Sequence, residues 1–299
     1  MKDIDFYNKM REEVAFNMPE LDISVTEVTK NNGLVLHGLV ASRKDSRISP
    51  TIYMENYHQR YENGWQMNDL VNEMIGLITT NTGEGIELDY FKEYDRVKDK
   101  IIFKVVNYDL NRELLDHVPH FKWNDLAIVF CHVCDVHSCG YATVLIRNEH
   151  MKMWNVTKEE LYDRAFDNTP MLMKDVLSTM ESVLSELGGF VFTPDGGEEI
   201  TEFADNMYIL SNKKRIFGAS AMLYSEHLKL LANKHNSGLY ILPSSIHEVI
   251  VLPEGAIEDT KYMRDMICEV NETQVSPEEK LSDNLYYYDR EARQIRIAG

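Results

Sequence analysis

The hydrophobic pattern of the first forty residues predicts a helix followed by a β-hairpin. Apolar side chains at helical spacing predict an amphipathic helix that ends near Pro19: Ile4, Tyr7, Met10 and Val14. Two β-rich runs follow, Ile23–Thr29 and Leu34–Val40. Between these runs, Asn32 and Gly33 can both adopt positive φ, so the pair predicts a tight hairpin turn.

Two helices and three strands are predicted next. Ser49 followed by Pro50 is typical of an N-cap and a first helical residue, and that helix would carry three tyrosines on one stripe: Tyr53, Tyr57 and Tyr61. The following helix has a continuous apolar face and ends before Gly83: Met67, Leu70, Val71, Met74, Ile75 and Ile78. Strands are then expected in three apolar runs: Ile101–Val106, Leu126–Val133 and Tyr141–Ile146.

The middle of the chain returns to helical spacing. Thr157 and Glu160 stand three residues apart, as in a capping box, and predict the start of one helix. Thr169-Pro170 predicts the start of a second helix that would end at Gly188-Gly189 and carry a long apolar face: Met173, Val176, Leu177, Met180, Val183, Leu184 and Leu187. The acidic stretch 193–205 contains Gly and Pro, which indicates a connector.

The last hundred residues look internally repetitive. A short strand with a similar sequence occurs three times: Tyr208–Asn212, Tyr240–Ser244 and Leu285–Asp289. Each is followed by a second short apolar run: Ile216–Ala219, Glu248–Leu252 and Gln294–Ile297. The order ββα-ββα-ββ favours an antiparallel sheet with helices packed on one face, although chance similarity between hairpins would look the same.

These elements together predict an α+β fold with antiparallel sheets. Length favours more than one domain. We expect an N-terminal α+β subdomain at residues 1–155, a helical linker region with the acidic connector at 156–205, and a C-terminal α+β subdomain at 206–299.

Four segments resemble an uncharacterised family of bacterial proteins that is known only as a domain of unknown function. They are Ile48–Tyr53, Ile146–His150, Tyr208–Asn212 and Leu242–Val249. Because these segments are spread over most of the chain, the resemblance is full-length. It implies a common fold and a bacterial cytoplasmic setting, and it implies no activity, cofactor or catalytic residue.

Charge and composition narrow the classes of function. The chain has 31 basic and 49 acidic residues and a net charge of −18, which argues against binding to nucleic acid or to anionic lipid. The longest apolar runs are strand-sized, so no membrane span is expected. The charged residues among the first 21 argue against a secretory signal, and four cysteines are too few for a disulfide framework. We therefore expect a cytoplasmic protein.

A cluster of thiols and imidazoles is the sharpest chemical feature. Cys131, Cys134, His137 and Cys139 are of the residue types that bind zinc, and the thiols are also candidates for a redox pair. However, Cys131 continues a predicted strand, in which residues three apart point to opposite faces. This cluster is also outside the pattern that the resemblance implies. We favour Cys131 as a core residue, with Cys134, His137 and Cys139 on an exposed hairpin turn, and keep a zinc- or redox-linked module as an alternative.

A second cluster holds a hydroxyl, an imidazole and a carboxylate: Ser245, His247 and Glu248. These groups are the ingredients of nucleophilic hydrolysis. Catalytic triads usually gather residues from separate segments, and no Gly-x-Ser-x-Gly elbow occurs. We therefore favour a structural turn and keep an unrecognised hydrolase as an alternative.

The absence of a glycine-rich phosphate loop counts against a nucleotide enzyme. The run Tyr286–Tyr288 would make a recognition surface if it were exposed. The favoured expectation is a non-catalytic cytoplasmic module, without a cofactor, that binds another protein through a face of the C-terminal sheet or its helices.

Overall fold

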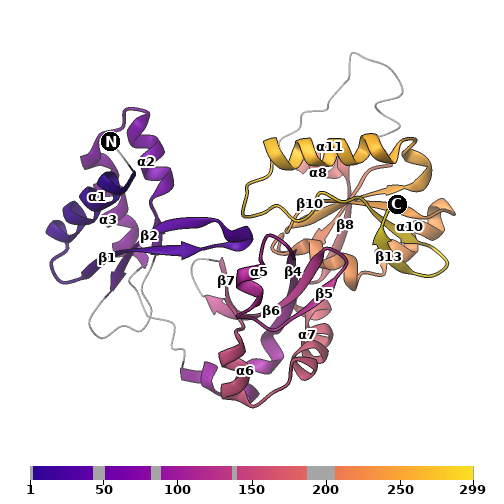
Figure 1. Ribbon diagram of the computed structural model, residues 1–299, viewed down its shortest axis with the longest axis horizontal. Helices are drawn as coiled ribbons and strands as arrows, with labels where there is room; N and C mark the ends of the chain where they lie inside the picture. Colours follow the sequence, from indigo (N-terminus) through magenta and orange to yellow (C-terminus); the bar gives the residue numbers. More distant parts are fainter. Residues whose placement is uncertain (1–2, 43–50, 82–88, 137–139, 187–205, 299) are drawn as a thin grey trace. The chain divides into compact units, whose positions relative to one another are not determined.

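The chain forms two compact units, residues 1–89 and 90–299. The computed structural model describes residues 3–42, 51–81, 89–136, 140–186 and 206–298. The fold is α+β with antiparallel sheets, as predicted (Figure 1). Residues 90–155 share one unit with residues 206–299, so the division lies earlier in the chain than the expected one at 155.

The first unit packs its helices on one face of a small antiparallel sheet with the order β1-β2-β3 (Figure 1). Its elements are α1 (Asp3–Asn17), β1 (Asp22–Thr29), η1 (Asn31–Gly33), β2 (Val35–Ser42), β3 (Thr51–Tyr53), α2 (Glu55–Glu62) and α3 (Met67–Asn81). The core lies between the sheet and the helices. Its fully buried side chains come from α1, from β2, from α3 and from the residue just before α2: Phe6, Met10, Val14, Leu39, Met54, Leu70, Met74 and Ile78.

Local sequence signals set most of this unit. The predicted hairpin forms, with Asn32 at φ 60° and Gly33 at φ 71° in the turn between β1 and β2. The predicted helix start at Ser49-Pro50 falls on two residues outside the described ranges, and the described residues after it do not become helical until Glu55. Tyr53 belongs to β3, where it pairs with Gly38, and α2 begins only at Glu55. The main-chain ladder to β2 therefore outweighs the local helix signal.

The second unit contains two antiparallel sheets. In the first, called the β6 sheet, β6 (Leu126–Val136) lies in the centre; β4 pairs along one of its edges, and β5 and β7 pair end to end along the other. The surrounding elements are η2 (Asp89–Lys92), α4 (Tyr94–Val97), η3 (Lys98–Lys100), β4 (Ile101–Asn107), α5 (Arg112–Leu115), β5 (His120–Trp123), β7 (Gly140–Leu145), α6 (Asn148–Trp154) and α7 (Lys158–Leu172).

The second sheet, called the β10 sheet, has the strand order β13-β12-β10-β11-β9-β8. Its elements are β8 (Asp175–Thr179), α8 (Met180–Glu186), β9 (Tyr208–Asn212), η4 (Gly218–Leu223), α10 (His227–His235), β10 (Leu239–Ser245), β11 (Glu248–Pro253), η5 (Glu254–Ala256), α11 (Thr260–Thr273), β12 (Tyr286–Asp289) and β13 (Gln294–Ile297). Helix α11 covers one face, where Met263 and Ile267 pack on Leu242 and Leu252.

The long helix predicted from Thr169 to Leu187 is wrong. Helix α7 continues to Leu172 with Pro170 in its last turn, and β8 follows before the short helix α8. The Thr169 hydroxyl does not cap a new helix, because it donates to Ala165 O and accepts from Phe103 N. Strand β8 gains a complete ladder with β9, which the local apolar spacing could not reveal. The expected cap Gly188-Gly189 and the connector 193–205 lie outside the described residues.

The ββα-ββα-ββ repeat is not confirmed. The predicted strand Ile216–Ala219 is absent from this described segment, where Phe217 has φ 54° and η4 begins at Gly218. A Cβ atom at Gly218 would collide with Ser211 Oγ and with His247 O, so glycine lets this segment lie against β9 and β11. The later hairpins β10–β11 and β12–β13 do form as predicted.

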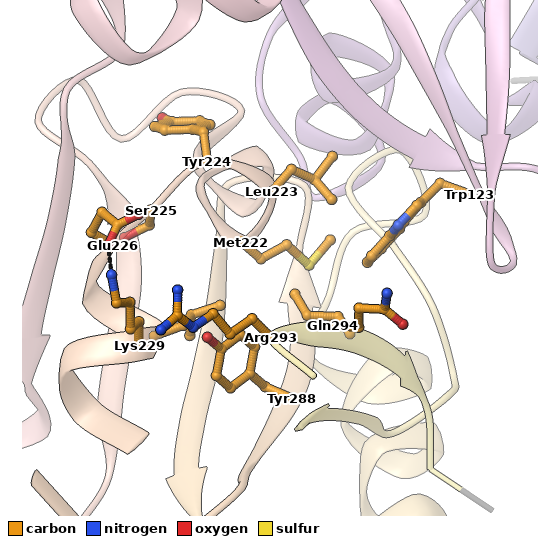
Figure 2. A pocket seen from close by; sticks show the side chains of 12 residues that line it. Trp123, Met222, Leu223, Tyr224, Ser225, Glu226, Lys229, Tyr288, Arg293 and Gln294 are labelled. Carbon is orange, nitrogen blue, oxygen red and sulfur yellow. Dashed lines mark hydrogen bonds and ion pairs between the residues drawn. The ribbon is translucent and has the colours of Figure 1, made fainter. Parts of the chain in front are cut away.

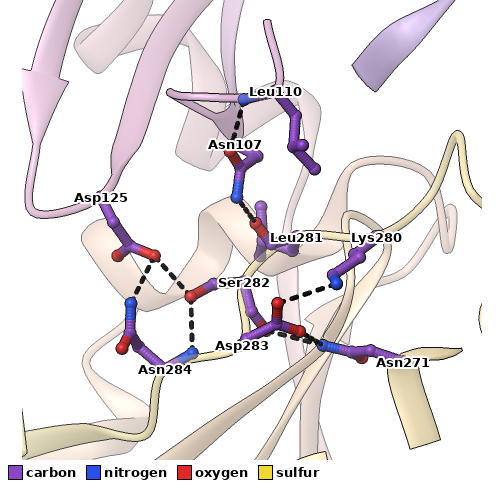
Figure 3. A network of polar contacts seen from close by, with 9 residues as sticks. All are labelled: Asn107, Leu110, Asp125, Asn271, Lys280, Leu281, Ser282, Asp283 and Asn284. Carbon is purple, nitrogen blue, oxygen red and sulfur yellow. Dashed lines mark hydrogen bonds and ion pairs between the residues drawn. The ribbon is translucent and has the colours of Figure 1, made fainter. Parts of the chain in front are cut away.

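Asp125 joins the two sheets of the second unit (Figure 3). It lies in the turn between β5 and β6, and its carboxylate accepts hydrogen bonds from Ser282 Oγ at 2.5 Å and from Asn284 Nδ2 at 2.9 Å. The hydroxyl of the fully buried Tyr286 donates to the same carboxylate at 2.6 Å. This network fixes the end of β5 over β12, which brings Trp123 near the β12–β13 hairpin.

Candidate functional site

The second unit contains a pocket of about 500 Å³ where three segments meet (Figure 2). Trp123 from β5 stands on one side, η4 and the start of α10 form another, and the β12–β13 hairpin supplies the third. Its lining consists of Trp123, Met222, Leu223, Tyr224, Ser225, Glu226, Leu228, Lys229, Tyr288, Arg293, Gln294 and Ile295. We call this feature the Trp123 pocket.

Hydrogen bonds hold the wall that η4 and α10 form. Tyr224 OH donates to Met173 O at 2.6 Å, and Ser225 Oγ donates to Asp175 Oδ2 at 2.5 Å. Ser225 Oγ also accepts from His227 N at 3.0 Å, which satisfies a main-chain donor at the start of α10. Burial, together with the nearby charge of Asp175, raises the pKa of Tyr224. The wall is therefore tied to β8 at Asp175 and to the end of α7 at Met173.

The β12–β13 hairpin is held by its own turn and by α10. Asp289 Oδ1 accepts from Glu291 N at 2.9 Å and from Ala292 N at 2.8 Å, which stabilises the turn. Arg290 donates to Asn233 Oδ1 on α10 and to Oδ1 of Asn236, the residue that follows this helix. Trp123 is held by a contact with the ring of Tyr286 on β12, because the two ring centroids lie 5.9 Å apart.

The pocket combines apolar and aromatic surface with basic side chains. Lys229 Nζ pairs with Glu226 Oε2 at 3.1 Å. Arg293 has an exposed side chain, and this side chain forms no hydrogen bond or ion pair with any residue that the structure describes. Burial raises the pKa of Tyr288, while the positive charge of Arg293 acts in the opposite direction. The phenol therefore stays protonated near neutral pH and can donate a hydrogen bond.

The chemistry of this lining suits binding better than proton transfer. Within the described lining, Glu226 is the only carboxylate, and it is exposed and already paired with Lys229. A general base needs a perturbed environment and hydrogen-bond reach to the group that it deprotonates. Aromatic, methionine and arginine side chains are instead enriched in the cores of protein–protein interfaces.

Ser245, His247 and Glu248 lie close together, but the hydroxyl and the imidazole do not face each other. Ser245 Oγ accepts from the main-chain His247 N at 3.0 Å, and Ser245 pairs with Glu248 at the end of the β10–β11 ladder. The imidazole Nδ1 accepts from Phe217 N at 3.2 Å, so its Nε2 carries the proton and lies 3.5 Å from Glu279 Oε1. The structure thus places a turn here, and a hydrolase at these residues stays a prediction.

The thiols of Cys131 and Cys134 lie on opposite faces of β6. Cys131 is buried beside Ile102 and Met173, and burial raises the pKa of its thiol. Cys134 points to the other face, where Tyr90 OH lies 3.9 Å from its Sγ. It is buried within β6, so the expectation of an exposed turn at Cys134 is wrong. His137 and Cys139 lie outside the described residues.

No group of three or more potential metal ligands gathers in the described ranges. Zinc or redox chemistry at Cys131, Cys134, His137 and Cys139 therefore stays a prediction.

Sequence reasoning missed Trp123, Arg293 and the η4 wall. The tyrosine run contained the relevant signal, because Tyr288 lines the pocket while Tyr286 anchors the two sheets. Trp123 directly precedes the turn at Asn124 and Asp125. This position in the sequence indicates the end of a strand, but it does not indicate which distant residues contact the Trp123 ring. The pocket depends on contacts between three segments that lie at least 59 residues apart, from Lys229 to Tyr288, and no local pattern encodes such contacts.

Across the described ranges, every helix is too short or too polar to cross a lipid bilayer. The chain belongs to DUF5688, a family of unknown function, whose model matches residues 4–290. No curated protein and no solved structure matches the chain significantly.

Proposed function

We propose that this member of DUF5688 is a non-catalytic module that binds another protein through the Trp123 pocket. One observation carries the proposal: Trp123, Tyr288 and the unpaired cation of Arg293 converge on a single cavity. Tryptophan, tyrosine and arginine are the residues that most often dominate the binding free energy of protein interfaces. Leu223 adds half-buried apolar surface beside them, and the buried Met222 backs the same wall.

The proposal places the protein in a reducing cytoplasm. Cys131 and Cys268 are free thiols, and burial raises the pKa of both. Thiols with raised pKa values react slowly, and they suit a compartment in which disulfides do not form.

Site-specific photo-crosslinking tests the proposal. A benzophenone amino acid replaces Gln294 in the pocket, and a matched control replaces Leu110, which is 46% exposed in the same unit and outside the pocket lining. We expect a discrete crosslinked protein from position 294 in the native cytoplasm and none of the same mass from position 110.

The captured protein is then purified, and its affinity for the wild-type chain is compared with that for Trp123→Ala and Tyr288→Ala. Truncation of a central interface residue costs at least about tenfold in affinity. Unchanged affinity in both variants, with melting temperatures equal to that of the wild type, would show that the pocket is not the binding surface.

A further inference from the structure

Strand β13 forms one edge of the β10 sheet, and its outer main-chain groups are unpaired in the described structure. It pairs with β12, and Ala298 N donates to Leu285 O just beyond the ladder. Bonded and non-bonded pairs alternate along an antiparallel ladder. The N–H and C=O groups of Ile295 and Ile297 therefore point away from β12, toward the open edge.

Another edge in the same unit is closed. Two outward N–H groups of β4 are satisfied by side-chain hydroxyls: Phe103 N donates to Thr169 Oγ1 at 3.0 Å, and Val105 N donates to Ser220 Oγ at 3.2 Å. Proteins commonly cover or cap exposed strand edges, because such edges recruit other strands. Within the described part of the chain, β13 has no comparable cap.

The open edge adjoins the Trp123 pocket. Ile295 lies opposite Tyr288 in the ladder, and both side chains line the pocket. Side chains alternate between the two faces of a strand. In a strand added beside β13, every second side chain would therefore lie on the face of Ile295 and Tyr288, next to Trp123.

The positive charge around β13 indicates what kind of segment could bind at its open edge. Residues 290–298 contain Arg290, Arg293 and Arg296 against the single acid Glu291, whereas the whole chain has a net charge of −18. The exposed side chains of Arg293 and Arg296 are available to carboxylates. A second copy of β13 would bring arginines close to arginines, and like charges across a ladder are destabilising.

We propose that the edge of β13 accepts an extended acidic segment of the partner protein as an added strand, with apolar side chains of that segment entering the Trp123 pocket. Strand addition is an established mode of peptide recognition, in which main-chain bonds supply affinity and side-chain pockets supply specificity. This inference rests on the proposed function, and it names the chemistry of the partner.

Binding of synthetic peptides to the full chain, followed by fluorescence anisotropy, tests the proposal. The probes are decapeptides that alternate Asp or Glu with Val, Ile or Tyr, and the control set has Lys in place of each acid. We expect acidic peptides to bind and lysine peptides to bind at least about tenfold more weakly. Failure of every acidic peptide, or equal binding by both sets, would overturn the proposal.

Two changes isolate the main-chain contacts. Ile295→Pro removes an outward N–H at an edge where proline is tolerated, and Ile295→Val is the matched control that keeps it. We expect the proline variant to bind the peptides about fivefold to tenfold more weakly, with the valine variant unchanged. Peptides N-methylated at alternate amides provide a second measurement that does not alter the protein: one of the two methylation frames should abolish binding and the other should not.

The outcomes separate this inference from the proposed function. If acidic peptides need Trp123 and Tyr288 but tolerate Ile295→Pro and both methylation frames, strand addition is wrong and the pocket remains a binding site. If the photo-crosslinked partner does not depend on Trp123 and Tyr288, the proposed function itself fails.

Discussion

Replacement of Asp125 by alanine tests whether one carboxylate holds the two sheets of the second unit together. The carboxylate accepts hydrogen bonds from Ser282 Oγ, Asn284 Nδ2 and Tyr286 OH at 2.5, 2.9 and 2.6 Å. In Asp125→Ala, the hydroxyl of Tyr286 would remain buried without its acceptor.

The expected loss follows from these contacts. A hydrogen bond to a charged group contributes about 1.5–3 kcal/mol, but bonds that share one acceptor are not additive. We expect Asp125→Ala to lower the free energy of unfolding of the second unit by about 3–5 kcal/mol. Tyr286→Phe removes one bond and should cost about 1–2 kcal/mol.

Urea unfolding followed by tryptophan fluorescence measures the loss. Trp65 lies in the first unit, so a Trp65→Phe background makes the remaining tryptophans, Trp123 and Trp154, report the second unit alone. The loss should shift the urea midpoint by about 1–2 M.

Two comparisons check the interpretation. The double variant of Asp125→Ala with Tyr286→Phe should lose less stability than the sum of the single variants, whereas Tyr288→Phe on the same strand, where no bond to the carboxylate exists, should behave as the wild type. A loss below about 1 kcal/mol, or additive single effects, would refute the view that this carboxylate joins the sheets.

Three further predictions concern pH, a glycine and a helix cap. Burial and the charge of Asp125 raise the pKa of Tyr286 above its ordinary 10.0, so the phenol loses its proton at a lower pH in the unfolded chain than in the folded one. The free energy of unfolding should therefore fall as pH rises above about 10. Urea titrations at several pH values should show this fall, and they should show a less steep one in Tyr286→Phe. Gly218→Ala should cost about 3 kcal/mol in urea unfolding because its Cβ meets Ser211 Oγ, whereas Gly76→Ala, with open space in α3, should gain about 0.5–1 kcal/mol; a neutral Gly218→Ala would contradict the packing. Thr157→Ala breaks the capping box of α7 and should cost about 1 kcal/mol, measured by the same unfolding, while Thr157→Ser should retain the cap.

Elements that depend on neighbours in sequence were predictable. The turn at Asn32-Gly33 adopts the positive φ angles that its residues favour. The predicted capping box at Thr157 and Glu160 forms: Glu160 N donates to Thr157 Oγ1 at 3.2 Å, and Thr157 N donates to Glu160 Oε2 at 2.8 Å. Strand β6 follows its apolar run. The atoms that stabilise the turn and the capping box lie within a few residues of one another. For β6, an unbroken apolar run is enough to predict a buried strand.

Elements that depend on distant partners were not predictable. The segment Met173–Leu187 has helical spacing, yet β8 forms because β9 offers a main-chain ladder about 30 residues farther along the chain. The segment Ile216–Ala219 has strand-like residues, yet the close approach of Gly218 to Ser211 and His247 bends it into η4.

By itself, the sequence determined the fold class, the main turns and caps, and the acidic charge of this protein, because these depend on composition and on contacts within about one helical turn. The tertiary structure alone decided that Trp123, Tyr288 and Arg293 share one pocket and that Ser245 faces main chain and not the imidazole of His247. The physical reason is that the pocket is formed by segments that are distant in the sequence. Which of these segments come into contact depends on the free energy of strand pairing and burial over the whole unit.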